Sequence, residues 1–290
     1  TFSVAQEKRY TVLEILTQTA MSFVLRVLDH DLKREVAMKV LLHGSSQAGD
    51  PSVQRFLKEA EIASFLQHPG VPPVLDRGVD RDGRVFFTMP LVSGKNLLEV
   101  IVEGEAKGRA QAFTSILRVV LSACEVAAFA HARGVLHRDL KPQNVMVGAF
   151  GEVLVVDWGL AKRRDDVQEA VTLSASVNTD LLATLPGSIL GTPSFISPEQ
   201  ARGEVDSIDE RSEVYSLGAI LYAVFTGKAP YLESASDTHE AILKRVLAGP
   251  PKPIETIGQG VPPELVAIAE KAMAHSKEGR YASASELAGD

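Results

Sequence analysis

Acidic, basic and amide side chains gather between residues 135 and 159 of this chain. Asp139 is followed two positions later by Lys141 and five positions later by Asn144, and a short hydrophobic run then leads to a second acid, Asp157. A carboxylate can align a hydroxyl and accept its proton, a lysine stabilises negative charge, and carboxylate and amide oxygens are good ligands for Mg²⁺. The spacing therefore predicts a site that can hold a hydroxyl, a phosphoryl group and two magnesium ions.

Short motifs elsewhere extend this pattern over most of the chain. The motifs are VAMK at 36–39, LHRDLKPQN at 136–144, VDWG at 156–159, GTP at 191–193 and SPE at 197–199. With them the chain resembles the protein-kinase family, in particular the bacterial eukaryotic-like (Hanks-type) serine/threonine kinases, over roughly residues 10–287. The resemblance implies an α+β, bilobal protein-kinase-like fold.

The resemblance also implies how the chain is divided. Residues 1–90 would form a small β-rich N-lobe with one main helix, and residues 91–290 a larger, mostly α-helical C-lobe. Because the chain begins at Thr1 rather than at methionine, we expect one catalytic domain excised from a longer protein.

The resemblance assigns roles to the polar residues of these motifs. Asp139 would accept or align the proton of the substrate hydroxyl, and Lys141 would stabilise the γ-phosphoryl group. Lys39 would hold the α- and β-phosphates of ATP, with Glu59 of the following helix as its salt-bridge partner. The expected ligands of two Mg²⁺ ions are Asn144 and Asp157.

Alignment to the family also predicts the nucleotide pocket. The expected ATP-binding residues, besides Lys39, are Leu16, Val24, Ala37, Met89, Pro90, Val92 and Met146. Met89 would be the gatekeeper, Pro90 would contribute only its carbonyl, and Val92 its N–H.

Two further contacts are expected downstream. Thr192 would bridge Asp139 and Lys141, next to the loop that docks a peptide substrate. Glu199 would form a buried, structural ion pair with Arg280.

Regulation by phosphorylation is predicted from Arg138, which precedes the catalytic acid. In the family this arginine binds a phosphorylated residue of the segment that follows the second acid. Of the hydroxyls in that long polar segment, Thr184 and Ser188 are the expected sites, with phosphate ordering the segment through Arg138.

The lid over the phosphates departs from the family pattern. Its matching stretch is residues 16–24, and threonine or serine stands at the three positions where the family has glycine, Thr17, Thr19 and Ser22. Glycine allows positive φ and close approach to an anion, which a β-branched residue resists. We expect either a strained lid that weakens nucleotide binding or a lid of different shape.

A second departure is Glu213, where the family has an aspartate that braces the catalytic loop. The main hypothesis is an active serine/threonine kinase that uses ATP and Mg²⁺, because every residue for charge stabilisation and metal binding is present. The alternative is a pseudokinase that binds partners without catalysis. A small-molecule phosphotransferase of related fold is a third option, against which the peptide-docking stretch Gly191–Glu199 argues.

Hydrophobic patterning predicts where regular structure lies. The expected strands are Tyr10–Leu16, Phe23–Asp29, Glu35–Leu42, Val74–Val79, Val85–Met89, Val145–Val147 and Val153–Val156. One helix is expected to begin at Pro51 and to stop before His68. After a break at Pro90–Gly94, the other expected helices are Phe113–Arg133, Glu213–Thr226, His239–Leu247 and Pro263–Ala274.

Composition limits the class of partner. The chain has 290 residues, 45% of them hydrophobic, and a net charge of −7, which argues against nucleic acid or an anionic membrane. Its single cysteine, Cys124, excludes an internal disulfide framework. We find no run of about 18 apolar residues and expect a cytoplasmic domain without membrane contact, although the whole protein could carry an anchor. Expected partners are protein substrates with a Ser or Thr acceptor, and a second copy for autophosphorylation.

Overall fold

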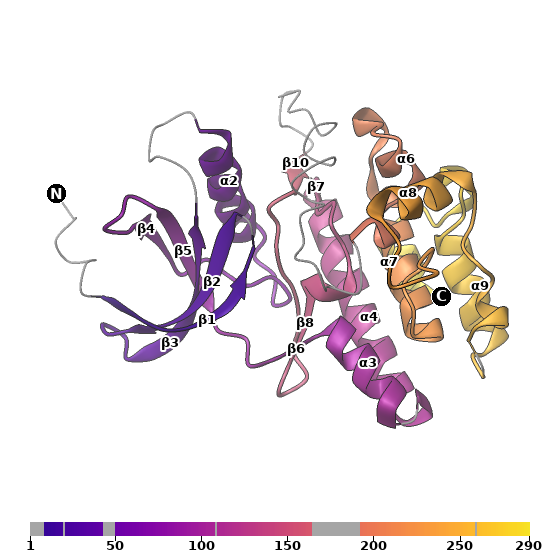
Figure 1. The fold of residues 1–290 in the computed structure, drawn as a ribbon, viewed down its shortest axis with the longest axis horizontal. Coiled ribbons are helices and arrows are strands. Elements are labelled where there is room, and N and C mark those ends of the chain that lie inside the picture. Colours follow the sequence, from indigo (N-terminus) through magenta and orange to yellow (C-terminus); the bar gives the residue numbers. More distant parts are fainter. Residues whose placement is uncertain (1–8, 20, 43–49, 108, 164–191, 259) are drawn as a thin grey trace. The chain divides into compact units, whose positions relative to one another are not determined.

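The computed structural model describes residues 9–19, 21–42, 50–107, 109–163, 192–258 and 260–290. The chain forms two compact units (Figure 1). The N-terminal unit comprises Thr1–Ser93 together with Asp157–Leu160, and the C-terminal unit comprises Gly94–Val156 and Ala161–Asp290. The first is built around a sheet and the second is mostly helical, so the α+β fold class predicted from the sequence is confirmed.

The N-terminal unit contains one antiparallel sheet with the strand order β1-β2-β3-β5-β4. Its strands are β1 (Tyr10–Gln18), β2 (Ser22–Asp29), β3 (Arg34–Leu41), β4 (Asp76–Val79) and β5 (Val85–Pro90). All five were predicted, with ends that differ by up to two residues. The largest differences are at β1, which continues to Gln18, and at β4, which begins only at Asp76.

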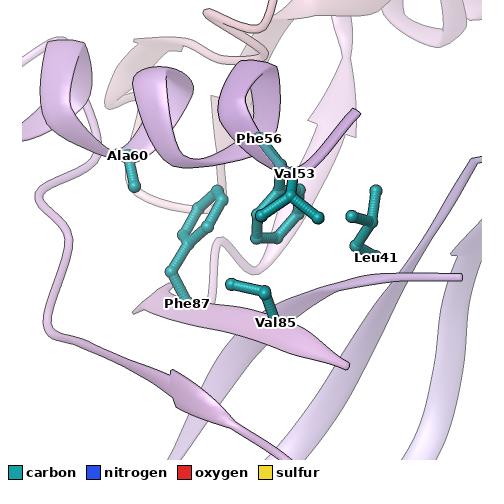
Figure 2. Close-up of a cluster of buried hydrophobic side chains, with 6 residues drawn as sticks. All are labelled: Leu41, Val53, Phe56, Ala60, Val85 and Phe87. Atoms are coloured by element: carbon teal, nitrogen blue, oxygen red, sulfur yellow. The ribbon is translucent and has the colours of Figure 1, made fainter. Parts of the chain in front are cut away.

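One helix, α2 (Pro51–Phe65), packs on a face of this sheet. Asp50 caps its first turn by accepting the Ser52 N–H, and the proline at the first helical position fits because no donor is needed there. The buried cluster between helix and sheet contains Leu41, Val53, Phe56, Ala60, Val85 and Phe87 (Figure 2). A second cluster covers the other face, with Val27, Val36, Met38, Val40 and Phe86. Both faces of the sheet therefore carry buried apolar side chains, and α2 packs on one of them.

The C-terminal unit is mainly helical. Its helices are α3 (Leu97–Lys107), α4 (Arg109–Ala132), α6 (Pro198–Ala201), α7 (Glu210–Thr226), α8 (His239–Ala248), α9 (Pro263–Ala272) and α10 (Ala284–Gly289). Its short strands are β6 (Gly94–Asn96), β7 (Val135–Leu136), β8 (Val145–Gly148), β9 (Val153–Val155) and β10 (Lys162–Arg163). They pair as β6-β8-β9 and as β10-β7.

Three helices of this unit were missed from the sequence: α3 and the short α6 and α10. A reciprocal cap begins α3: the Glu99 N–H donates to Asn96 Oδ1 at 3.0 Å, and the Asn96 N–H donates to Glu99 Oε2 at 2.8 Å. The Asn-x-x-Glu spacing that carries this cap was available in the sequence. The prediction failed because it relied on a longer apolar periodicity.

Helix α4 is apolar over Phe113–Ala132, long enough to cross a membrane by length and composition alone. The expectation that no such run exists was therefore wrong. One face of the helix, with Val120, Ala123 and Val126, is buried, whereas Arg118, Leu121 and Glu125 are exposed. This pattern is typical of a core helix with one solvated face.

Helix α7 is buried along nearly its whole length. Gly218 makes this possible, because a Cβ at that position would lie 2.7 Å from the Cβ of Ala272 in α9. The same helix presents Glu213 to the loop that follows β7.

The carboxylate of Glu213 contacts both that loop and helix α4. Its Oε1 accepts the backbone N–H of Arg138 at 2.5 Å, and its Oε2 lies 2.6 Å from Nε2 of His131. Burial would raise the pKa of Glu213, but the hydrogen bond and charge of His131, with the other donors, outweigh it and hold the pKa below its usual range. The additional methylene relative to aspartate is therefore accommodated, with the carboxylate satisfied on both oxygens.

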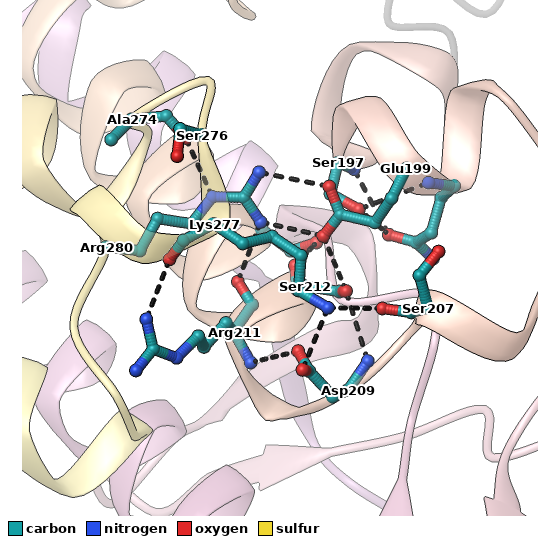
Figure 3. A network of polar contacts seen from close by, with 12 residues as sticks. Ser197, Glu199, Ser207, Asp209, Arg211, Ser212, Ala274, Ser276, Lys277 and Arg280 are labelled. Atoms are coloured by element: carbon teal, nitrogen blue, oxygen red, sulfur yellow. Dashed lines mark hydrogen bonds and ion pairs between the residues drawn. The ribbon is translucent and has the colours of Figure 1, made fainter. Parts of the chain in front are cut away.

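A second buried network joins α6 to the segment before α10 (Figure 3). The guanidinium of Arg280 donates to both carboxylate oxygens of Glu199, at 2.7 and 3.0 Å. It also donates to the carbonyls of Ala274, Arg211 and His275. Both charged groups are almost fully buried, so the ion pair predicted from the sequence is confirmed.

This ion pair generates a stability prediction. Removing one charge from a buried pair leaves the other uncompensated, so we expect Glu199→Gln to lower the free energy of unfolding by about 3 kcal/mol or more. Urea denaturation followed by circular dichroism measures the change. The matched control is Arg202→Ala, whose exposed partner Glu204 lies nearby and for which at most about 1 kcal/mol is expected.

The same pair predicts a pH dependence. Burial would raise the pKa of Glu199, but hydrogen bonds from Arg280 and Ser212 lower it from about 4.5 to about 2. A lowered folded-state pKa contributes stability that is fully present above the ordinary value and is lost as the pH falls through about 2. Glu199→Gln should lack this dependence, so parallel pH curves for the two proteins would contradict the assignment.

The contacts of Glu213 generate a third prediction. Glutamine offers one acceptor oxygen where the carboxylate serves two donors, so we expect Glu213→Gln to destabilise the domain by about 1–3 kcal/mol. Hydrogen exchange measured by mass spectrometry should become faster in residues 137–141. Glu125→Gln, at an exposed acid on the helix that carries His131, is the control. Unchanged exchange at Arg138 in Glu213→Gln would show that the brace is not needed.

Candidate functional site

Lys39 is the centre of the charged site in the N-terminal unit. Its Nζ lies 2.6 Å from Oε1 of Glu59 on α2 and 3.0 Å from Oδ1 of Asp157. The helix that packs on the sheet places Glu59, and the predicted Lys39–Glu59 pair is confirmed as a contact. The structure adds Asp157 to this pair.

Burial opposes a charge on Lys39, because the side chain is only 13% exposed. The carboxylates of Asp157 and Glu59 outweigh that effect and hold the pKa of Lys39 above its usual range. The ammonium therefore remains charged at neutral pH. A fixed positive charge of this kind is suited to phosphate oxygens.

The turn at Asp157-Trp158-Gly159 brings the second acid to Lys39. Asp157 has φ of 66°, a left-handed conformation that aspartate tolerates better than most residues. A Cβ on Gly159 would lie 3.1 Å from Oε2 of Glu59, so a larger residue would press on that carboxylate. Trp158 fills a buried position.

The catalytic candidates of the C-terminal unit form a second cluster. Asp139 Oδ2 lies 2.6 Å from Nζ of Lys141 and accepts from Nδ2 of Asn144 at 3.1 Å. The same amide nitrogen donates to the backbone carbonyl of Asp139 at 2.8 Å. The amide nitrogen of Asn144 is thus used inside the loop, and of its side-chain atoms the amide oxygen is the one suited to a metal ion.

His137 ties this loop to the strand that follows it. Its Nε2 lies 3.0 Å from the carbonyl of Val156, and its Nδ1 accepts the N–H of Asp139 at 3.3 Å. Both contacts fit the neutral tautomer with its proton on Nε2. The N–H of Val156 in turn donates to the carbonyl of Asn144 at 2.9 Å. The residue before Asp157 is therefore fixed to the loop that carries Asp139.

Arg138 has a strained backbone and a partly buried cation. Its φ is 69°, and two side chains hold this conformation: Glu213 accepts its N–H, and Gln200 Nε2 donates to its carbonyl at 3.0 Å. Its Nε is buried and has no hydrogen-bond partner among the described residues. Burial lowers the pKa of Arg138, although Glu213 acts in the opposite direction. Such a donor is suited to an incoming anion.

Three of the expected adenine residues lie on the sheet face that carries Lys39. Ala37 is two positions before Lys39 on β3, Val24 pairs with Lys39, and Met89 pairs with Ala37. Residues opposite one another in an antiparallel sheet point to the same face. These three side chains and the ammonium therefore share one surface of the sheet.

The remaining nucleotide candidates are placed differently. Leu16 is an exposed residue at a bulge of β1, and Pro90 ends β5 opposite Val36. Val92 follows β5 in irregular backbone, and Met146 lies on β8 of the C-terminal unit. A role for each of them in binding adenine stays a prediction.

The lid differs from the strained form considered above. Among the described residues, the non-glycine positions with positive φ are Lys33, Arg138, Asp157 and Tyr231. Thr17, Thr19 and Ser22 are therefore free of the strain that glycine would relieve. Instead β1 continues through its bulge, and a tight turn leads into β2.

The predicted regulatory hydroxyls Thr184 and Ser188 lie outside the described residues. Thr192 begins a short 3₁₀ helix, and the bridge predicted for its side chain likewise stays a prediction. Sequence reasoning missed His131 and Gln200, which hold the loop through Glu213 and the Arg138 carbonyl. Only Gln200 carried a signal, as the third residue after Ser197 in a capping box.

Within the described residues, no three acids, histidines or cysteines meet to bind a metal by themselves. Mg²⁺ is usually held by one or two carboxylates together with substrate phosphates and water. Asp157 and the amide oxygen of Asn144 are ligands of the right kind.

Comparison with known proteins agrees with this arrangement. A sequence model of the protein kinase domain matches residues 10–287. Serine/threonine-protein kinase PknB of Mycobacterium tuberculosis is 35% identical over 97% of the chain. Serine/threonine-protein kinases named PknD, from Protochlamydia amoebophila and Chlamydia felis, are 32% and 34% identical over 98% of it.

The chain spans only part of these relatives, 42% of PknB and 30% of each PknD. The resemblance inferred from the short motifs is nevertheless confirmed over nearly its full extent. The chain belongs to the protein kinase family.

Proposed function

We propose that this chain is a serine/threonine protein kinase domain that transfers the γ-phosphoryl group of ATP to Ser or Thr hydroxyls of proteins. The observation that carries the proposal is the ammonium of Lys39, held charged between Glu59 and Asp157. A buried lysine with two acids is costly to maintain for structure alone. It is useful where a polyanion must be held beside a metal.

Each charged residue has a step in this reaction. Lys39 holds the α- and β-phosphates, and Asp139 aligns the acceptor hydroxyl and takes its proton. As the P–O bond to the acceptor forms, the bond between the γ-phosphorus and the β,γ-bridging oxygen breaks and ADP leaves. Lys141, 2.6 Å from Asp139, neutralises charge on the transferred group. Bound Mg²⁺, held by Asp157 and Asn144, would neutralise charge on the β- and γ-phosphates.

The non-catalytic alternative has less support. Electrostatic stabilisation provides most of the rate in phosphoryl transfer, and every group for it is retained. Of the two departures from the family pattern, the lid adopts an unstrained turn in its described residues, and Glu213 still accepts the backbone N–H of Arg138. Lys141 and the printed names of the relatives favour serine and threonine as acceptors.

Further features of the proposal follow from the family. The small lobe would correspond to residues 1–90 and the large lobe to residues 91–290. Protein substrates, self-association for autophosphorylation and a cytoplasmic position of this domain are part of it. In the regulatory step, a phosphate group carried by Thr184 or Ser188 would accept a hydrogen bond from Nε of Arg138. This nitrogen lacks a hydrogen-bond partner among the described residues.

We expect Asp157→Asn to reduce transfer of radiolabel from [γ-³²P]ATP by at least about 100-fold, because the carboxylate that holds metal and Lys39 is lost. The control is Asp82→Asn, at an exposed acid of the same unit. Equal incorporation by Asp157→Asn and the wild type would favour the pseudokinase. Thermal shift with ATP, with and without Mg²⁺, then distinguishes a nucleotide-binding scaffold from an empty one.

Regulation predicts a phosphate in the segment between Lys162 and Gly191 after incubation with Mg·ATP. We expect the phosphorylated protein to be faster than phosphatase-treated protein, and this difference to vanish in Arg138→Gln. The control is Arg133→Gln, at an exposed arginine just before the catalytic loop. In this variant the phosphorylated protein should still be faster than the phosphatase-treated protein. Mass spectrometry and transfer assays measure both effects. Absence of phosphate from this segment would remove the proposed switch.

A further inference from the structure

The turn between β1 and β2 is closed by the side chain of Thr19. Its Oγ1 accepts the N–H of Ser22 at 3.0 Å and the N–H of Met21 at 3.3 Å. The backbone N–H of Thr19 donates to the carbonyl of Ser22 at 2.9 Å, and the two hydroxyls lie 3.1 Å apart. One neutral oxygen thus collects two neighbouring backbone donors.

Successive backbone N–H groups that converge on one point form a cradle for anions. Here the cradle is filled by the chain's own hydroxyl oxygen. A phosphate oxygen carries charge and makes stronger hydrogen bonds than a hydroxyl does. It could therefore replace Oγ1, but only the difference between the two sets of bonds would contribute to binding.

The cradle lies close to the ammonium that is proposed to hold phosphates. In the sheet Val24 pairs with Lys39, and Ser22 pairs with Leu41. The turn is therefore about two residues, or roughly 7 Å, farther along the strands. Both features belong to the N-terminal unit. A triphosphate on Lys39 is long enough to reach the Met21 and Ser22 amides.

We propose that Thr19 is a specificity-determining residue of the lid, whose hydroxyl competes with nucleotide phosphate for the amides of Met21 and Ser22. This inference rests on the proposed function. It attributes weaker binding of phosphate by the lid to one side chain rather than to the general loss of glycine. Binding of the adenosine part is independent of this competition.

The test is Thr19→Val, which keeps the size and branching of the side chain and removes the acceptor. We expect Mg·ATP and Mg·ADP to bind about 3- to 10-fold more tightly in calorimetric titration, with adenosine unchanged. The control is Thr17→Val, at an exposed residue of the same lid. Thr19→Gly, which also frees the backbone, should change ATP affinity in the same direction.

A measurement without nucleotide checks the starting state. The amides of Met21 and Ser22 should exchange faster in Thr19→Val than in the wild type, and Mg·ATP should protect them again. Unchanged ATP affinity in both variants overturns the proposal. Weaker ATP binding with unchanged adenosine binding also overturns it, since the hydroxyl would then support the phosphates directly.

The outcomes separate this inference from the proposed function. If the wild type transfers phosphate and Thr19→Val binds ATP no more tightly, the kinase assignment stands and the role of Thr19 is wrong. If neither protein binds ATP nor transfers phosphate, the kinase assignment fails and the competition fails with it.

Discussion

In the N-terminal unit, the ammonium of Lys39 forms ion pairs with Glu59 and Asp157, and the charged site depends on these two contacts. A buried charge is tolerated only when it is paired, and the acids that pair with Lys39 come from a helix and from a turn 118 residues away in sequence. The packing of α2 on the sheet sets the position of Glu59, and the left-handed Asp157 sets the second contact. The packing of the unit and the conformation of one turn therefore place both acids beside Lys39.

The catalytic loop of the C-terminal unit meets a different constraint. Arg138 adopts a backbone conformation that is unfavourable for its residue type, and strain of this kind persists only where the surroundings hold it. Glu213 and Gln200 supply that hold on the N–H and the carbonyl, while His137 fixes Asp139. The residues that position the acid thus lie largely outside the motif that contains it.

The sequence allowed most of the fold and the charged residues to be predicted, for reasons that particular residues make clear. The strands of the first unit could be predicted from their hydrophobic patterning, and α2 from its apolar stripe and the proline at its start. The Lys39–Glu59 and Glu199–Arg280 contacts follow from motif positions. The His131–Glu213 contact could not be predicted, because it depends on how one added methylene fits a buried space.

The lid illustrates a similar limit. Replacing glycine by threonine predicted either a strained lid or a lid of different shape, because backbone freedom alone does not decide between the two. The hydroxyl of Thr19 changes the result by supplying an acceptor inside the turn, so that the described residues need no positive φ. The conformational propensity of an amino acid describes that residue alone, whereas this turn depends on hydrogen bonds between the Thr19 side chain and neighbouring backbone N–H groups.

Retaining the charges while changing the lid has a consequence for catalysis. Contacts from the lid to the phosphates act on bound ATP and on the transition state to a similar extent. Losing such uniform binding raises KM and leaves kcat nearly unchanged. In the proposed function, Lys39, Asp139 and Asp157 act where charge develops, and their loss is expected to lower kcat itself. A kinase can therefore tolerate change in its lid at high ATP concentration, but not in these three side chains.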